Sequence, residues 1–102
     1  MKSKRTKACD ISPKVKKAVW ERDLHCCAIC GSTKASPVAH YIPRSQNGKG
    51  IEQNIVTLCD KCHYRLDQTT ERKKLLAIVK QYLDAEYPGF SDEKRVYRRG
   101  EE

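Results

Sequence analysis

Large apolar side chains are scarce in this sequence. Its 102 residues include one Trp, one Phe and one Met, and 38% of the chain is hydrophobic. A chain of this length buries only about two thirds of the surface that it exposes when unfolded, so we expect one small domain that needs support beyond its core. No apolar run is long enough to span a bilayer, so no membrane partner or transmembrane span is expected.

No secretion signal is expected, because the N-terminal stretch MKSKRTKACD is basic and no apolar segment follows it. The sequence therefore predicts an intracellular, cytoplasmic protein. In a reducing compartment, cysteines spaced in pairs act as metal ligands more often than as disulfides. The six cysteines of the chain are thus the first candidates for the missing support.

Two Cys-x-x-Cys units, CAIC and CDKC, are separated by 28 residues. Two thiolates at this spacing grip one edge of a zinc tetrahedron, and two such units complete a closed structural site. Two alternatives stay open, because the units can form disulfides and Cys26 can replace its neighbour Cys27 as a ligand. Cys9 has no partner at a ligand spacing and is expected to be a free thiol. The spacing predicts a structural zinc ion held by Cys27, Cys30, Cys59 and Cys62.

Positive charge gathers toward the N-terminal end of the chain. The net charge is +8, from 21 Lys and Arg against 13 Asp and Glu. Residues 1–25 carry eight basic and three acidic side chains, whereas residues 88–102 carry four of each. This distribution suits a polyanion such as DNA that is contacted mainly from one end. The alternative is a charged surface that only keeps the protein solvated.

Spacing and turn residues indicate the first elements. The stretch DISPKVKKAVWERD predicts a short helix that is capped by Ser12 and has Pro13 in its first turn. The stretch PVAHYIPRS, residues 37–45, alternates like a half-buried strand. One face of this strand is expected to carry Val38, His40 and Ile42.

The second half reads as loop, strand and two helices. RSQNGKGIEQ is a Gly- and Asn-containing loop, NIVTL is a second short strand, and a short helix is expected from Asp60 to about Asp67. TTERKKLLAIVKQYLDAEY predicts a helix capped by Thr69 or Thr70, with an apolar stripe of Leu75, Leu76, Val79, Tyr82 and Leu83. We expect a basic N-terminal arm over residues 1–11, one domain over 12–87 and a loosely held tail over 88–102.

Four polar side chains stand out within or beside the cysteine-bounded segment. His63 and Asp67 lie four residues apart on the expected helix, so both project from one face, which is a good geometry for one divalent ion. A hairpin of the two strands would bring His40 toward that helix. Taken singly, each has a structural alternative, such as a core histidine or, for Asn54, a turn residue.

In combination these residues resemble a known family. AHYIPRSQNGKGIEQNIVTLCDKCHYRLD is similar to the HNH endonucleases, in which a histidine shortly precedes a proline, an asparagine follows a Gly-rich loop and a histidine lies on the next helix. WERDLHCCAICGS resembles the lead-in of four-cysteine members from bacteria and their phages, and the likeness spans roughly residues 19–67. It implies an α+β fold, a small zinc-stabilised ββα-metal (His-Me finger) HNH domain with flanking helices, inside the region 12–87.

The resemblance also implies roles for single residues. His40 matches the general base that activates water, and His63 matches a metal ligand. Asn54 matches a position that either binds the metal or holds the loop. Asp67 stands where colicin-type relatives have a further histidine ligand, whereas Ala39 stands where the family usually has a metal-binding Asp or His. Oxygen-rich ligation with one imidazole suits Mg²⁺ or Mn²⁺, and Ni²⁺ or Zn²⁺ could substitute.

The implied activity is hydrolysis of phosphodiester bonds in DNA, expected to be double-stranded, by a metal-dependent endonuclease. Because Ala39 cannot bind metal, a non-catalytic zinc-stabilised DNA-binding module is the alternative, and a zinc-held adaptor for proteins is a third. The enzyme would work in a bacterial cell or a phage-infected host, as a monomer or a homodimer. Phosphate contacts are expected from four basic side chains near the motif, Arg44, Lys49, Lys61 and Arg65.

Overall fold

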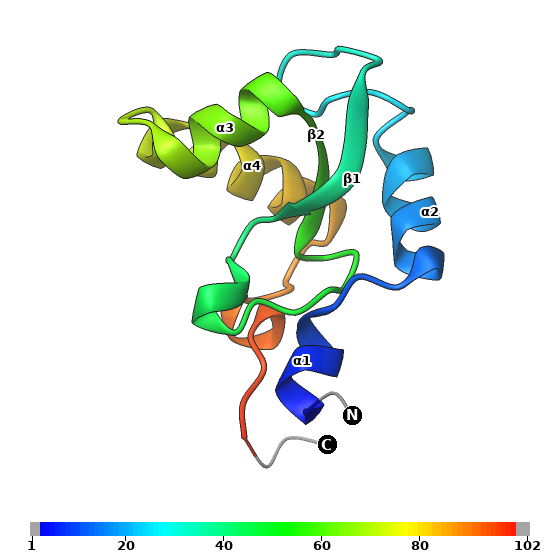
Figure 1. Cartoon of the computed structure of the whole chain (residues 1–102), viewed down its shortest axis with the longest axis vertical. Helices are drawn as coiled ribbons and strands as arrows, with labels where there is room; N and C mark the ends of the chain where they lie inside the picture. Colours follow the sequence, from blue (N-terminus) through cyan, green and yellow to red (C-terminus); the bar gives the residue numbers. More distant parts are fainter. Residues whose placement is uncertain (1–2, 100–102) are drawn as a thin grey trace.

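A two-stranded antiparallel sheet lies at the centre of the protein, between one helix on one side and two on the other (Figure 1). The computed structural model describes residues 3–99. Residues 1–2 of the expected arm and residues 100–102 of the expected tail lie outside this range. The elements, in chain order, are α1 (Lys4–Cys9), α2 (Pro13–Arg22), β1 (Ala35–His40), the 3-10 turn η1 (Arg44–Gln46), β2 (Ile55–Cys59), α3 (Asp60–Gln68), α4 (Arg72–Glu86) and the 3-10 turn η2 (Asp92–Arg95).

The hairpin and the helix after it confirm the expected α+β class. β1 pairs with β2 from Ala35 opposite Cys59 to His40 opposite Ile55, with an irregularity between Ser36 and Ala39. α2 contacts both strands, while α3 follows β2 directly and packs on β2 and α4. The order strand, long loop, strand, helix is the one expected for a ββα-metal domain.

The two faces of β1 alternate in burial, as expected for a half-buried strand. Ala39 has 0% of its surface exposed and belongs to the core cluster, whereas Val38 is 37% exposed. The face with Ala39 therefore packs against α3 and α4 in the core, and the face with Val38 and His40 is the more exposed one. The strand also begins two residues earlier than expected and ends at His40, where the chain turns toward Pro43.

The helices follow their caps and apolar stripes. Ser12 caps α2 by accepting a hydrogen bond from the Val15 N–H, and Pro13 is its first residue, as expected. α4 begins at Arg72 rather than at a Thr69 or Thr70 cap, because Thr69 instead closes α3. The expected stripe on α4 is confirmed, since its fully buried members are Leu75, Val79 and Leu83.

A buried ion pair joins three elements at the end of α2. Arg22 Nε donates to Asp23 Oδ1 at 2.7 Å, and the two side chains are 10% and 0% exposed. Asp23 Oδ2 accepts from the Thr57 N–H at 2.8 Å, and Tyr82 of α4 donates to Asp23 Oδ1. Arg22 also donates to the Ile55 carbonyl at 2.8 Å. This network fastens α2 to β2 and α4.

Replacing Asp23 with alanine should lower the free energy of unfolding by about 3–5 kcal/mol, since Arg22 would stay buried without its counter-charge. Urea denaturation followed by circular dichroism measures the change. The matched control is Lys80→Ala, which breaks the exposed Lys80–Asp84 pair of α4 and should change stability by less than about 1 kcal/mol. Equal effects of the two substitutions would contradict a structural role for the buried pair.

The C-terminal segment is held more firmly than expected from its composition. Arg95 of η2 has 0% of its surface exposed, donates to the Gln53 carbonyl at 2.7 Å and pairs with Asp92 at 2.6 Å. Gly48 and Val96 form an isolated β-bridge. The described part of the tail, residues 88–99, thus packs on the loop between β1 and β2, because the buried guanidinium bonds to a carbonyl of the loop and to a carboxylate of the tail itself. Within residues 3–99, no helix has the length and apolar character needed to cross a membrane.

Candidate functional site

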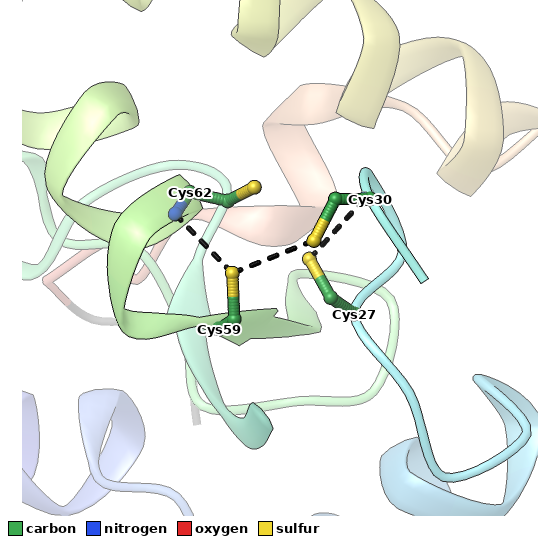
Figure 2. A group of neighbouring side chains, drawn as sticks. All are labelled: Cys27, Cys30, Cys59 and Cys62. Carbon is green, nitrogen blue, oxygen red and sulfur yellow. Dashed lines mark hydrogen bonds between the residues drawn. The ribbon is translucent and has the colours of Figure 1, made fainter. Parts of the chain in front are cut away.

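Four cysteine sulfurs meet between the loop after α2 and the start of α3 (Figure 2). Their Sγ atoms all lie within 4.8 Å of one another, and those of Cys30 and Cys59 are 3.6 Å apart. Zinc–sulfur bonds of about 2.3 Å place the sulfurs of a tetrahedral site about 3.8 Å apart. The cluster fits a zinc ion held by Cys27, Cys30, Cys59 and Cys62, as the spacing predicts. The disulfide alternative finds no support, because all six cysteines are free.

Each Cys-x-x-Cys unit forms a zinc knuckle, a turn whose own backbone N–H groups point at its sulfurs. The Cys30 N–H approaches Cys27 Sγ at 3.5 Å, and the Cys62 N–H approaches Cys59 Sγ at 3.4 Å, where Cys59 also caps α3. Gly31 turns the first knuckle back with a positive φ of 79°, which glycine adopts without strain. Cys26 is not a ligand, because its thiol bonds to the Asp23 carbonyl instead.

The pKa values of the cysteine thiols in the cluster are shifted in opposite directions. Burial raises the pKa of Cys27, but the N–H groups of Cys30, Cys59 and Ile29 outweigh it and lower the pKa to about 7. Burial and the neighbouring thiols raise the pKa of Cys62. One thiolate therefore forms readily, and a zinc ion would supply the positive charge that keeps the others ionised.

A cavity of about 660 Å³ is lined by most of the expected catalytic residues. β1 contributes His40, and α3 contributes His63 and Asp67, so the first strand of the hairpin and the helix meet at this cavity as expected, whereas β2 and Asn54 do not line it. Two further walls come from the N-terminal segment and from the loop after β1. The cavity is lined by Asp10, Ile11, Lys16, Val38, His40, Pro43, Arg44, His63 and Asp67.

His40 is held by a backbone carbonyl and is biased toward its neutral form. Its Nε2 lies 2.9 Å from the Cys9 carbonyl oxygen. Because a carbonyl only accepts, Nε2 carries the proton and Nδ1 of the neutral ring is the acceptor. Burial lowers the pKa of His40, and the nearby charges of Arg44 and His63 act in the same direction, whereas the Cys9 bond and Asp10 oppose them. A neutral imidazole is the form that can accept a proton.

Asn54 holds the loop between the strands and does not line the cavity. Its side chain is fully buried, its Oδ1 accepts from the Ile42 N–H at 2.9 Å, and its Nδ2 donates to the carbonyls of Ile42 and Lys49 at 3.1 and 2.9 Å. Of the two family roles, this geometry favours loop holding. The metal-ligand role stays a prediction, because in this structure the amide oxygen accepts a hydrogen bond inside the loop.

His63 and Asp67 form the expected pair on α3. His63 Nε2 lies 3.1 Å from Asp67 Oδ2, and the side chains are 36% and 44% exposed. Within residues 3–99, the four cysteines are the only group of three or more His, Cys, Asp and Glu side chains whose ligand atoms lie within 4.8 Å of one another. A cation bound here would take at most two ligands from this pair, and the rest would have to come from phosphate and water. Ala39 carries no donor and faces the core.

The four basic residues expected at DNA lie in different settings. Arg44 is on the cavity wall but pairs with Asp10 at 2.8 Å. Arg65 pairs with Glu71, which raises the pKa of Arg65 through that hydrogen bond. Lys61 is exposed on α3, and Lys49 lies half-buried in the loop. Only Arg44 among them borders the cavity with His40.

Sequence reasoning missed the contribution of the N-terminal segment. The Cys9 carbonyl that holds His40 is 31 positions away in the chain, and Asp10 adds a carboxylate to the cavity wall. Every residue has a backbone carbonyl, so no residue type marks the one that holds His40. Asp10 is a single acidic residue at the end of a basic stretch. No pattern in the sequence could have placed them at the site.

The central segment of the chain matches a known protein family. Residues 27–68 match the family described as HNH endonuclease. The matched range runs from the first zinc cysteine to the end of α3, so it contains the hairpin, the loop held by Asn54 and the pair His63–Asp67. Searches of the curated proteins and of the solved structures each found no significant match. Residues 27–68 of this chain thus match an HNH endonuclease domain and hold four cysteines positioned to bind a metal ion.

Proposed function

We propose that this protein is a metal-dependent endonuclease that hydrolyses phosphodiester bonds in DNA, with His40 as the general base. The observation that supports this best is the cavity in which His40, bonded through Nε2 to the Cys9 carbonyl, shares a wall with His63 and Asp67. The base and the candidate metal ligands come from different elements of the matched HNH domain. The proposal places the enzyme in the cytoplasm of a bacterium or of a phage-infected cell.

In the proposed reaction, Nδ1 of His40 accepts a proton from a water molecule, whose oxygen attacks the phosphorus. The P–O bond to the leaving oxygen breaks, and that oxygen takes up a proton from solvent. His63 and Asp67 would hold a divalent cation, which would neutralise charge on the scissile phosphate and on the leaving oxygen. Asn54 keeps the loop after β1 in place and so fixes the end of the strand that carries His40.

DNA that reaches the cavity would pass several basic side chains. Lys16 and Arg44 line the cavity, and Lys61 is exposed on α3. Such side chains bind phosphates and set affinity without reading bases. DNA affinity is therefore expected to fall steeply as salt rises, which fluorescence anisotropy with a labelled duplex measures.

The candidate metal ligands His63 and Asp67 allow a direct test of the proposal. Purified protein incubated with supercoiled plasmid should nick or linearise it with Mg²⁺ or Mn²⁺ and not with EDTA. His63→Ala should weaken the affinity for the metal, so the Mn²⁺ concentration needed for half-maximal cleavage should rise about 10- to 100-fold. Gln68→Ala, on the same helix but outside the cavity, is the matched control. Unchanged Mn²⁺ dependence in His63→Ala would remove this residue from the metal site.

The pH dependence follows from the lowered pKa of His40. Burial stabilises its neutral form, so the acid limb of kcat/KM should lie below the ordinary histidine pKa of about 6.5. The same shift affects stability, because the unfolded chain takes up this proton first as pH falls. Titration of His40 therefore leaves the free energy of unfolding unchanged above pH about 6.5. It lowers the free energy of unfolding as pH falls from there toward the folded pKa. An acid limb well above pH 6.5 would contradict this assignment.

One observation favours a second function, a zinc-stabilised DNA-binding module without catalysis. Ala39 offers no ligand and is fully buried, so the cation would have fewer protein ligands than the family usually provides. Intact folding with salt-sensitive DNA binding and no cleavage in any of Mg²⁺, Mn²⁺, Ni²⁺ or Zn²⁺ would establish this alternative.

A further inference from the structure

The segment Ala8–Asp10 lies outside the matched HNH domain but touches its cavity from the side. The Cys9 carbonyl oxygen accepts two hydrogen bonds, one from His40 Nε2 and one from Arg44 Nη1, both at 2.9 Å. Arg44 Nη2 bonds to Asp10 Oδ1 at 2.8 Å. The side chain of Cys9 is fully buried. One carbonyl thus links the N-terminal segment to the proposed base and to a neighbouring arginine.

The loop between the strands is shaped to receive this segment. Gly50 donates its N–H to the Ala8 carbonyl at 2.9 Å. A Cβ on Gly50 would lie 2.0 Å from the Asp10 carbonyl oxygen and 2.9 Å from that of Cys9. Both distances are shorter than atoms tolerate, and the atoms met are backbone, which cannot rotate away. Any larger residue at position 50 must push the Cys9–Asp10 backbone out of its place.

The segment is also anchored at its start. Arg5 of α1 donates to Asn47 Oδ1 and to the Arg44 carbonyl, both in the η1 region. α1 is capped by Ser3, which accepts from the Thr6 N–H. Figure 1 shows α1 beside the loop that follows β1. The described arm is therefore docked along its length, in contrast to a freely solvated charge run.

We propose that the N-terminal segment is a positioning element of the active site, in which the Cys9 carbonyl holds His40 with its proton on Nε2 and so presents Nδ1 as the base. Gly50 is the residue that makes this docking sterically possible. Its catalytic consequence rests on the proposed nuclease function, whereas the hydrogen bond itself does not. The wrong tautomer would place a proton on the atom that must accept one.

The test compares Gly50→Ala with Gly89→Ala in the full-length, zinc-loaded protein. Gly89 has a φ of 80°, and a methyl group added there would meet nothing within 4 Å, so alanine strains the backbone without touching the arm. The readout is the Nε2 proton of His40 in NMR spectra, assigned by its loss in His40→Ala. It should be visible in the wild type and in Gly89→Ala. In Gly50→Ala it should exchange with solvent at least about fivefold faster.

Cleavage kinetics supply the second readout. Gly50→Ala should lower kcat about 100-fold and leave the KM for DNA within about threefold, whereas Gly89→Ala should keep both. Arg44→Ala removes two bonds to the same segment and gives a second variant if Gly50→Ala does not fold; it too should accelerate exchange of the His40 proton. A proton on Nδ1 in the wild type, or unchanged exchange in the folded variants, would overturn the proposal. A wild type that shows the protected proton but cleaves no DNA would refute the nuclease function alone.

Discussion

Replacing Cys59 with serine is expected to unfold the domain. Structural zinc sites contribute about 10–16 kcal/mol of apparent binding free energy, which matches or exceeds the whole stability of a typical domain, about 5–15 kcal/mol. Cys59 also ends β2 and caps α3, so its loss disconnects the hairpin from the helix that carries His63. The small core described above cannot compensate for such a loss.

Circular dichroism and zinc content measured on the purified protein check this prediction. The variant should contain little bound zinc and show no cooperative thermal transition, and a strong chelator should do the same to the wild type. Cys26→Ser is the matched control, because Cys26 lies next to a ligand but bonds to the Asp23 carbonyl, and this variant should keep its zinc. A folded, zinc-free protein after chelation would show that the cysteine cluster is dispensable for folding.

Replacing His40 with alanine should lower the rate of DNA cleavage by about 10²- to 10⁴-fold, the range in which general bases contribute. The reason is that nothing else on the described cavity wall can take the proton as readily. Asp10 is paired with Arg44, and His63 and Asp67 are the proposed ligands of the cation, whose charge would disfavour their taking up a proton. Binding of DNA should change by less than about threefold, because phosphate contacts come from other side chains.

Plasmid nicking and duplex anisotropy, measured on the same preparations, separate these two effects. His25→Asn is the control, because His25 stacks on Trp20 with ring centroids 5.0 Å apart, away from the cavity. Its φ of 60° is one that asparagine accepts. If His40→Ala cleaved DNA as fast as the wild type, the base would have to be sought elsewhere. If it lost binding and cleavage together, His40 would act in DNA contact.

Much of the site could be predicted from local spacing. The zinc ligands come as two pairs, and each knuckle is closed by N–H groups within three residues of its own sulfur. His63 and Asp67 share a face because a helix brings residues four apart together. The cap of α2 and the buried stripe of α4 follow the same short-range rules. Such features depend on a few neighbouring dihedral angles, so the residue pattern determines them.

The tertiary structure alone decided which distant groups surround these residues. It joined the adjacent residues Arg22 and Asp23 to β2 and α4 in a buried network, and it fastened the expected tail through Arg95. In the fold, Asn54 holds the loop by hydrogen bonds and Ala39 is buried in the core.

The contact between the Cys9 carbonyl and His40 also required the fold, because every residue has such a carbonyl and only the path of the chain selects one of them. The sequence by itself thus determined the metal knuckle and the identity of the candidate catalytic side chains. The fold decided how the proposed base is held, since that depends on backbone groups brought together over long loops.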